Sequence, residues 1–302
     1  MKAVKTDKIE KSYKDIRALK DISFEVEEGE LFGIIGPDGA GKTTLFRVLT
    51  SLLMADSGTA KVTGLDVVKD YKLLRQRIGY MPGRFSLYMD MSVEENLTFF
   101  ASLYKTTIDE NYDLIKDIYQ QIEPFKDRKA ANLSGGMKQK LALSCALIHK
   151  PAVLFLDEPT TGVDPVSRQE LWDMLKKLNQ ENITVVVSTP YMDEATLCDR
   201  VALMQEGQIL QIDSPQNIVE QYRQVLWSVK ADNMYRLLLD LRVNRGVNSC
   251  FAFGESHHVT VNQHISMSQL EEYLIEKGHT GINITPIEAS IEDCYMQLAV
   301  NS

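Results

Sequence analysis

The sequence predicts an α/β fold with a mainly parallel β-sheet, followed by a small α+β appendix. Two uninterrupted apolar runs, at residues 152–156 and 183–188, are typical of strands that are buried on both faces of a parallel sheet. Segments with helical periodicity alternate with these runs, as they do in α/β domains. A glycine-rich stretch at 36–41 joins a strand-like segment at 31–35 to a helical pattern at 43–53. Together these observations indicate an α/β core.

The other core elements follow in chain order. Residues 21–26 alternate between apolar and polar side chains and are predicted to form a strand. Pro124 ends the second of two consecutive helical patterns, and Pro165 begins a later helix, where a proline is tolerated. The predicted helices are at 92–104, 110–122, 134–149 and 165–178.

The pattern changes after about residue 215, which predicts a separate small domain. Strand and helix patterns there follow the order βαββαβ, which resembles a split βαβ unit. A last helix is expected near 291–298. We therefore predict a large first domain at 1–222 and an appendix at 223–302. The appendix elements are at 225–230, 233–241, 249–253, 257–261, 268–277 and 282–285.

Charge and cysteine content narrow the classes of function. The formal net charge is -9, and the acidic and basic residues are mixed along the chain, which argues against nucleic acid as a partner. Neither a secretory signal nor an apolar run of about 18 residues is visible, so we expect a cytoplasmic chain without a membrane span. The cysteines are far apart, which predicts neither a zinc site nor a disulfide framework: Cys145, Cys198, Cys250 and Cys294.

One segment matches the phosphate-binding pattern GxxxxGK followed by serine or threonine. Glycines let the backbone amides surround phosphate groups, and the N-terminus of the following helix adds positive potential. Lys42 would neutralise phosphate charge, and the Thr43 hydroxyl would be a ligand to Mg²⁺. The residues predicted to bind ATP here are Gly36, Pro37, Asp38, Gly39, Ala40, Gly41, Lys42, Thr43 and Thr44.

Two carboxylates, Asp157 and Glu158, end the apolar run at 152–156. Asp157 would hold the magnesium ion through water, and Glu158 would polarise the water that attacks the γ-phosphate, as the catalytic residue. The alternative is a solvated acidic strand end without function. The phosphate-binding loop in the same sequence disfavours that alternative.

A third segment separates these two motifs: Leu133, Ser134, Gly135, Gly136 and Met137, here called the signature segment. Alone, it would be a helix cap after a flexible turn. Between the other two motifs, it makes the chain resemble the ATP-binding subunit of an ABC transporter over about residues 3–220. The tail, ending in PIEASIEDCYMQL, is similar in a looser way to ATPases of ABC-2 type exporters.

This resemblance implies a P-loop NTPase core with an antiparallel β subdomain and a helical subdomain at about 90–149. It implies that the signature segment acts in trans, on ATP held by a second ATP-binding subunit. Tyr13 would stack on the adenine, although it could instead only pack on the first sheet. Residues 161–164 match the family's D-loop, with Asp164 at the dimer interface. ATP, Mg²⁺ and membrane-spanning subunits at the cytoplasmic face of the cell membrane are further implications.

Two positions depart from the family pattern. Gly83 replaces a glutamine that touches magnesium and water, and Pro190 replaces a histidine that contacts the γ-phosphate. Neither replacement has a side-chain donor. We therefore expect a weakened site on this chain and an asymmetric pair, a heterodimer rather than a homodimer. The alternatives are tolerated variation, a regulatory or assembly module with little hydrolysis, and a soluble ABC ATPase outside transport.

Overall fold

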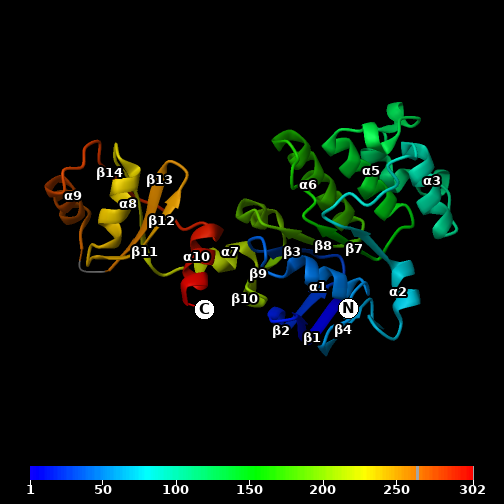
Figure 1. Cartoon of the computed structure of the whole chain (residues 1–302), viewed down its shortest axis with the longest axis horizontal. Helices are drawn as coiled ribbons and strands as arrows, with labels where there is room; N and C mark the ends of the chain where they lie inside the picture. Colours follow the sequence, from blue (N-terminus) through cyan, green and yellow to red (C-terminus); the bar gives the residue numbers. More distant parts are fainter. Residues whose placement is uncertain (263–264, 302) are drawn as a thin grey trace. The chain divides into compact units, whose positions relative to one another are not determined.

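The computed structural model (Figure 1) describes residues 1–262 and 265–301 and divides into two compact units, Met1–Pro215 and Gln216–Ser302. The sequence pattern put the boundary seven residues later, after residue 222. The residues between the two boundaries include the short helix α7 (Pro215–Glu220), and all of this helix except Pro215 belongs to the second unit.

The first unit is built on a six-stranded sheet with the order β10-β9-β3-β8-β7-β6. All neighbouring pairs are parallel except β9 and β10. Every residue of β3, β7 and β8 is buried, as the apolar runs predicted. This confirms the α/β prediction. The strands are β3 (Leu31–Ile35), β6 (Ile78–Met81), β7 (Val153–Asp157), β8 (Thr184–Thr189), β9 (Arg200–Gln205) and β10 (Gln208–Asp213).

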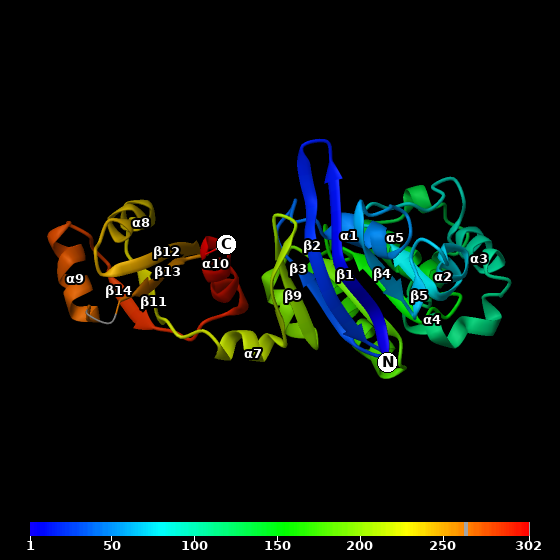
Figure 2. The ribbon, with the colours of Figure 1, turned by 90° about the horizontal axis from the view of Figure 1, so that it is seen from below.

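A second, antiparallel sheet with the order β2-β1-β4-β5 lies in the same unit. Its first two strands form the long hairpin that is visible in Figure 2. The sequence prediction recognised only residues 21–26 of the second strand and missed the first. The strands are β1 (Lys2–Tyr13), β2 (Ile16–Glu27), β4 (Ser57–Val62) and β5 (Leu65–Asp66).

Helix α1 (Lys42–Leu49) contributes apolar side chains to a core that it shares with both sheets. Phe46 of this helix meets Phe155 of β7 edge to face, with ring centroids 5.7 Å apart. Because α1 is held between two sheets, the loop that precedes it is fixed at the carboxyl ends of the parallel strands. The remaining helices of the core are α2 (Tyr71–Arg77) and α6 (Pro165–Gln180), with the 3₁₀ segment η4 (Met192–Leu197).

A helical region separates β6 from β7, where the sequence predicted a helical subdomain. Ser92 begins its first helix with a capping box to Glu95, and Ser134 caps the helix that begins within the signature segment. The helices are α3 (Val93–Leu103), α4 (Tyr112–Tyr119) and α5 (Gly135–Leu147), with short 3₁₀ turns η1 (Asp109–Asn111), η2 (Glu123–Phe125) and η3 (Ala130–Asn132).

The second unit has the predicted βαββαβ order, and α10 follows it. Its sheet order, β12-β13-β11-β14, consists of antiparallel pairs only. Trp227 and Val229 of the sheet pack with Leu237 and Leu270 of the helices in a core of their own. The elements are β11 (Val225–Lys230), α8 (Met234–Arg242), β12 (Val247–Phe253), β13 (Ser256–Val261), α9 (Met267–Glu276), β14 (Asn283–Pro286) and α10 (Ile291–Asn301).

All four cysteines are buried and carry free thiols. Burial raises the pKa of each thiol, because a thiolate is disfavoured away from water. A helix that crosses a membrane must be long and apolar, and none in the described parts of the chain has both properties.

A chain truncated after residue 215 is expected to fold by itself and to bind nucleotide. The reason is that the first unit has a complete core of its own, from the two sheets and α1. Thermal unfolding of the truncated and full chains, with and without magnesium-ATP, measures this. An insoluble product, or one without a cooperative transition, would show that residues 216–302 belong to the same folding unit.

Candidate functional site

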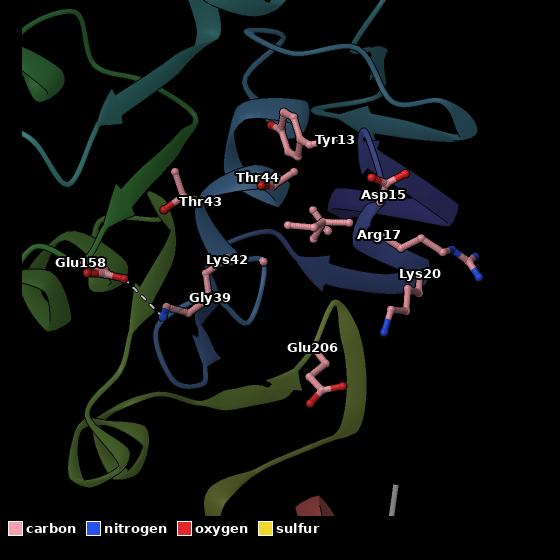
Figure 3. Close-up of a pocket in the computed structure, with 13 residues that line it drawn as sticks. Tyr13, Asp15, Arg17, Lys20, Gly39, Lys42, Thr43, Thr44, Glu158 and Glu206 are labelled. Carbon is pink, nitrogen blue, oxygen red and sulfur yellow. Dashed lines mark ion pairs between the residues drawn. The ribbon is translucent and has the colours of Figure 1, made fainter.

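A cavity of about 700 Å³ opens beside the loop that joins β3 to α1 (Figure 3). Ligands of open α/β sheets bind at the carboxyl ends of the strands, which is where this loop begins. Three other segments complete the wall: the β1–β2 hairpin, the end of β7 and the β9–β10 turn. The lining residues are Tyr13, Asp15, Ile16, Arg17, Ala18, Lys20, Gly39, Gly41, Lys42, Thr43, Thr44, Glu158 and Glu206.

Glycine is required at both ends of the loop. A Cβ atom on Gly36 would lie 2.1 Å from the carbonyl oxygen of Met204, so no larger residue fits. Gly41 precedes α1 with φ of 105°, and a Cβ there would come within 2.5 Å of the carbonyl oxygen of Ala18. The loop therefore packs closely on its neighbours. Four of the predicted loop residues lie outside the described cavity lining, namely Gly36, Pro37, Asp38 and Ala40, and of these Pro37 and Asp38 are exposed.

Lys42 is the buried cation of the cavity, with 3% of its side chain exposed. Its ammonium group donates to the carbonyl oxygens of Gly36 and Pro37, at 2.8 and 3.0 Å. Glu158 Oε1 lies 3.2 Å from the same nitrogen, the ion pair that is drawn as a dashed line in Figure 3. A buried ammonium beside a glycine-rich loop can pair with an anionic group that enters the cavity.

Glu158 is held in an unusual backbone conformation, with φ of 53°. Its N–H donates to the carbonyl oxygen of Ser188 at 3.0 Å and to the Ser188 hydroxyl at 3.1 Å. A non-glycine residue in the left-handed region costs about 1–3 kcal/mol and is found preferentially at functional sites. This backbone conformation directs the Glu158 carboxylate from the end of β7 into the cavity.

Asp157 is buried, and its Oδ1 accepts a hydrogen bond of 2.7 Å from the Ser188 hydroxyl. Burial, with a further contribution from the Asp157 carboxylate, raises the pKa of Tyr80 to about 12. Thr43 lines the cavity. Asp157 itself is outside the described lining, one residue before Glu158. A carboxylate and a hydroxyl are oxygen ligands of the kind that suit a magnesium ion.

The two departures from the family pattern lie beside these groups. A Cβ atom on Gly83 would lie 3.0 Å from the carbonyl oxygen of Asp157 and 3.9 Å from Cβ of Glu158. Pro190 directly follows β8, whose last residue, Thr189, accepts a hydrogen bond of 3.2 Å from the N–H of Gly36. A side chain at 83 would therefore adjoin the acidic pair, and residue 190 directly follows a strand end that is hydrogen-bonded to the loop.

The signature segment contributes none of the described residues that line the cavity. Leu133 is buried, and Ser134 Oγ accepts from the N–H of Met137 at 3.3 Å. The first glycines of α5 instead face the D-loop region: Cβ atoms on Gly135 and Gly136 would lie 3.8 Å from the Gly162 carbonyl oxygen and 3.5 Å from Ser167 Oγ.

Asp164, predicted at a dimer interface, is the N-cap of α6. Its Oδ1 accepts from the backbone N–H groups of Val166 and Ser167, at 3.1 and 3.0 Å. These bonds, led by that of Ser167, lower the pKa of Asp164. The carboxylate is exposed, so the cap leaves it accessible.

Sequence reasoning missed part of the cavity wall. Asp15, Arg17 and Lys20 come from the β1–β2 hairpin, and Glu206 comes from the β9–β10 turn. Tyr13, the hairpin residue that was predicted, lines the cavity with 43% of its side chain exposed. The missed residues follow no local motif, and only the pairing of the hairpin with the rest of the unit brings them together.

Comparisons with known proteins agree with this geometry. A family model described as ABC transporter matches residues 19–161. The probable multidrug ABC transporter ATP-binding protein YbhF of Escherichia coli is 44% identical over 208 residues, 68% of this chain but only 36% of that protein. This chain thus spans about a third of that relative's length.

Two other relatives are matched over most of their length. The Nod factor export ATP-binding protein I of Burkholderia lata is 37% identical over 70% of this chain and 71% of its own. The linearmycin resistance ATP-binding protein LnrL of Bacillus subtilis is 36% identical over 69% of this chain and 68% of its own.

Solved structures show the same fold. CbiO1 from Clostridium perfringens, part of the ABC transporter complex cbiONQ, has a TM-score of 0.64 at 30% identity, covering 73% of this chain and 91% of its own. A dimeric ATP-binding cassette in a post-hydrolysis state, bound to ADP and Pi, has a TM-score of 0.64 at 26% identity, covering 70% and 98%. This chain therefore belongs to the ABC transporter family, as one of its ATP-binding proteins.

Proposed function

We propose that this chain is the ATP-binding subunit of an ABC exporter and binds magnesium-ATP in the cavity beside α1. Hydrolysis of ATP would drive export through separate membrane-spanning subunits at the cytoplasmic face of the membrane. The observation that carries the proposal is the Lys42 ammonium, buried at the end of a glycine-rich loop and within 3.2 Å of Glu158. The relatives named for export support the transport class.

The cavity fits a nucleotide in size and charge. Its volume of about 700 Å³ lies in the range of small-molecule sites. The loop amides and Lys42 would hold the phosphates, and Tyr13 would stack on the adenine. Thr43 and Asp157 would hold magnesium, which neutralises phosphate charge when bound.

The ion pair between Lys42 and Glu158 suggests how binding prepares the site. A phosphate that takes the Lys42 ammonium competes with the Glu158 carboxylate for the same charge. The displaced carboxylate is then free to orient a water molecule toward the γ-phosphate. Positioning and charge neutralisation are the main requirements of phosphoryl transfer, so this chain's residues need no covalent step.

A second ATP-binding subunit would complete each site. The signature segment, Leu133 to Met137, lies outside the described lining of this chain's own cavity, which suits its use by a partner. Gly83 and Pro190 lack donors beside the acidic pair, which favours a weak site on this chain. A heterodimer with a complete second subunit would retain one strong site.

The same two residues favour a second candidate function, a regulatory or assembly module that binds ATP and hydrolyses little. Isolation of a tagged chain from native membranes tests the choice. We expect a membrane-spanning chain and a second ATP-binding chain to co-purify, and a tagged unrelated cytoplasmic protein to bring down neither. Recovery of the chain without any membrane-spanning partner would support the regulatory module instead.

A further inference from the structure

Glu194 is a buried carboxylate that the proposed catalytic steps do not use. It follows Pro190 in η4, and only 1% of it is exposed. A buried carboxylate is costly unless several donors compensate its charge. Here four side chains donate to it: Thr160, Arg168, Trp172 and Thr189.

The two oxygens of this carboxylate bind different parts of the fold. Oε2 accepts from the hydroxyl of Thr160, at 3.1 Å, and from the hydroxyl of Thr189, so it joins the segment before the D-loop to the end of β8. Oε1 accepts from Arg168 Nε at 2.5 Å and from Trp172 Nε1 at 3.0 Å, both on α6. One oxygen therefore links two loops, and the other fixes the carboxylate to a helix.

The Thr189 side of this arrangement reaches the phosphate loop. The Thr189 hydroxyl also accepts from the N–H of Tyr191 at 3.1 Å, which holds the turn around Pro190. The Thr189 carbonyl accepts from the N–H of Gly36, the first residue of the glycine-rich loop. A movement of that loop on ligand binding would therefore act on Thr189.

The Thr160 side reaches the signature helix. Thr160 directly precedes the D-loop, and the carbonyl of Thr161 accepts a hydrogen bond of 3.3 Å from Gln139 Nε2 of α5. A connected network of groups thus extends from Gly36 through Thr189, Glu194 and Thr160 to the D-loop and α5. Each step is either a hydrogen bond or a covalent link within one residue or between adjacent residues.

We infer that Glu194 is a positioning residue that couples nucleotide in this chain's cavity to the conformation of the D-loop. This inference rests on the proposed ATP site. It adds that binding of nucleotide there changes the D-loop, which would face the second subunit. Two further contacts hold Arg168, the donor on α6, in place. Its Nη2 also pairs with Asp193 at 3.1 Å, and its guanidinium lies 4.2 Å from the Tyr191 ring centroid.

The test is Thr160→Val in the full chain, which removes one hydroxyl and leaves the Thr189 bond to Glu194 in place. Hydrogen exchange is measured with and without magnesium and a non-hydrolysable ATP analogue. In the unaltered chain we expect the analogue to slow exchange at 36–43, 188–191 and 160–164. In Thr160→Val, slowing at the first two segments should remain, while that at 160–164 should fall about fivefold or more.

Thr160→Ser, which keeps the hydroxyl, is expected to restore the response at 160–164, whereas a purely steric role would not. Thr196→Val is a control for the removal of a threonine hydroxyl outside this network, because Thr196, in the η4 segment with Glu194, is exposed and donates only to the Asp193 carbonyl among the described contacts. Equal slowing at 160–164 in Thr160→Val and the unaltered chain would overturn the coupling. Absence of slowing at 36–43 in the unaltered chain would overturn the proposed ATP site itself, and the coupling with it.

Discussion

Lys42→Ala is expected to abolish the rise in melting temperature that magnesium-ATP gives the intact chain. Lys42 is a buried cation with two carbonyl acceptors and one carboxylate within 3.2 Å. Without it, Glu158 would face the phosphates with no neutralising charge. In binding sites, truncation of one partner of a buried, hydrogen-bonded charge pair costs about 2–5 kcal/mol. That is a loss in affinity of roughly thirtyfold to several thousandfold.

Lys20→Ala is the matched control, because Lys20 lines the same cavity on the hairpin side, away from the phosphate loop. We expect a smaller loss of affinity there. The comparison is made by titration of each variant with magnesium-ATP, followed by thermal unfolding. If nucleotide stabilised Lys42→Ala as much as the intact chain, the assignment of this cavity to the phosphates would be wrong.

The parts that the sequence predicted best are those that a local pattern defines. The glycine-rich loop and the apolar run that ends at Asp157 are continuous stretches of sequence, although the contacts that require glycine at 36 and 41 are tertiary. The resulting α/β prediction is confirmed. The roles of Lys42, Asp157 and Glu158 remain predictions, because they concern a ligand.

The first strand was missed because its pattern is irregular. β1 contains register shifts between Thr6 and Ile9, and Lys8 has φ of 51°, so apolar and polar residues do not alternate with a period of two. Without β1, the hairpin that carries Asp15 and Arg17 could not be placed at the cavity. Local periodicity carries no information on such bulges.

The donors to Glu194 were invisible for another reason. Thr160, Arg168 and Thr189 are separated in the chain by a loop, a helix and a strand, and each has an ordinary local role. Only the packing of α6 beside β8 brings them to one carboxylate. A buried polar cluster of this kind depends on tertiary structure, so no spacing rule predicts it.

The second large effect concerns the pairing of subunits. The purified chain alone is expected to hydrolyse ATP slowly, and addition of a complete second ATP-binding subunit should restore activity. The reason is that the side chains of Gly83 and Pro190 supply no donor to the transferring phosphoryl group. The loss of one such donor typically lowers the rate by about a hundredfold or more. In the restored pair, Ser134→Ala should reduce steady-state hydrolysis more than Glu158→Gln, since Ser134 would serve the partner's strong site.

Ser134 also caps α5, so Ser134→Thr, which keeps both hydroxyl and cap, is the control and should retain activity. Pro190→His should raise the rate of the isolated chain, because it returns a donor beside the phosphate loop. Gly83→Gln is a weaker test of the same idea. Its Cβ would lie only 3.0 Å from the Asp157 carbonyl oxygen, so the loop must shift to accept the glutamine. Hydrolysis by the unaltered isolated chain at the several-per-second rates of ordinary enzymes would contradict the asymmetric pair, because two weakened sites could not sustain it.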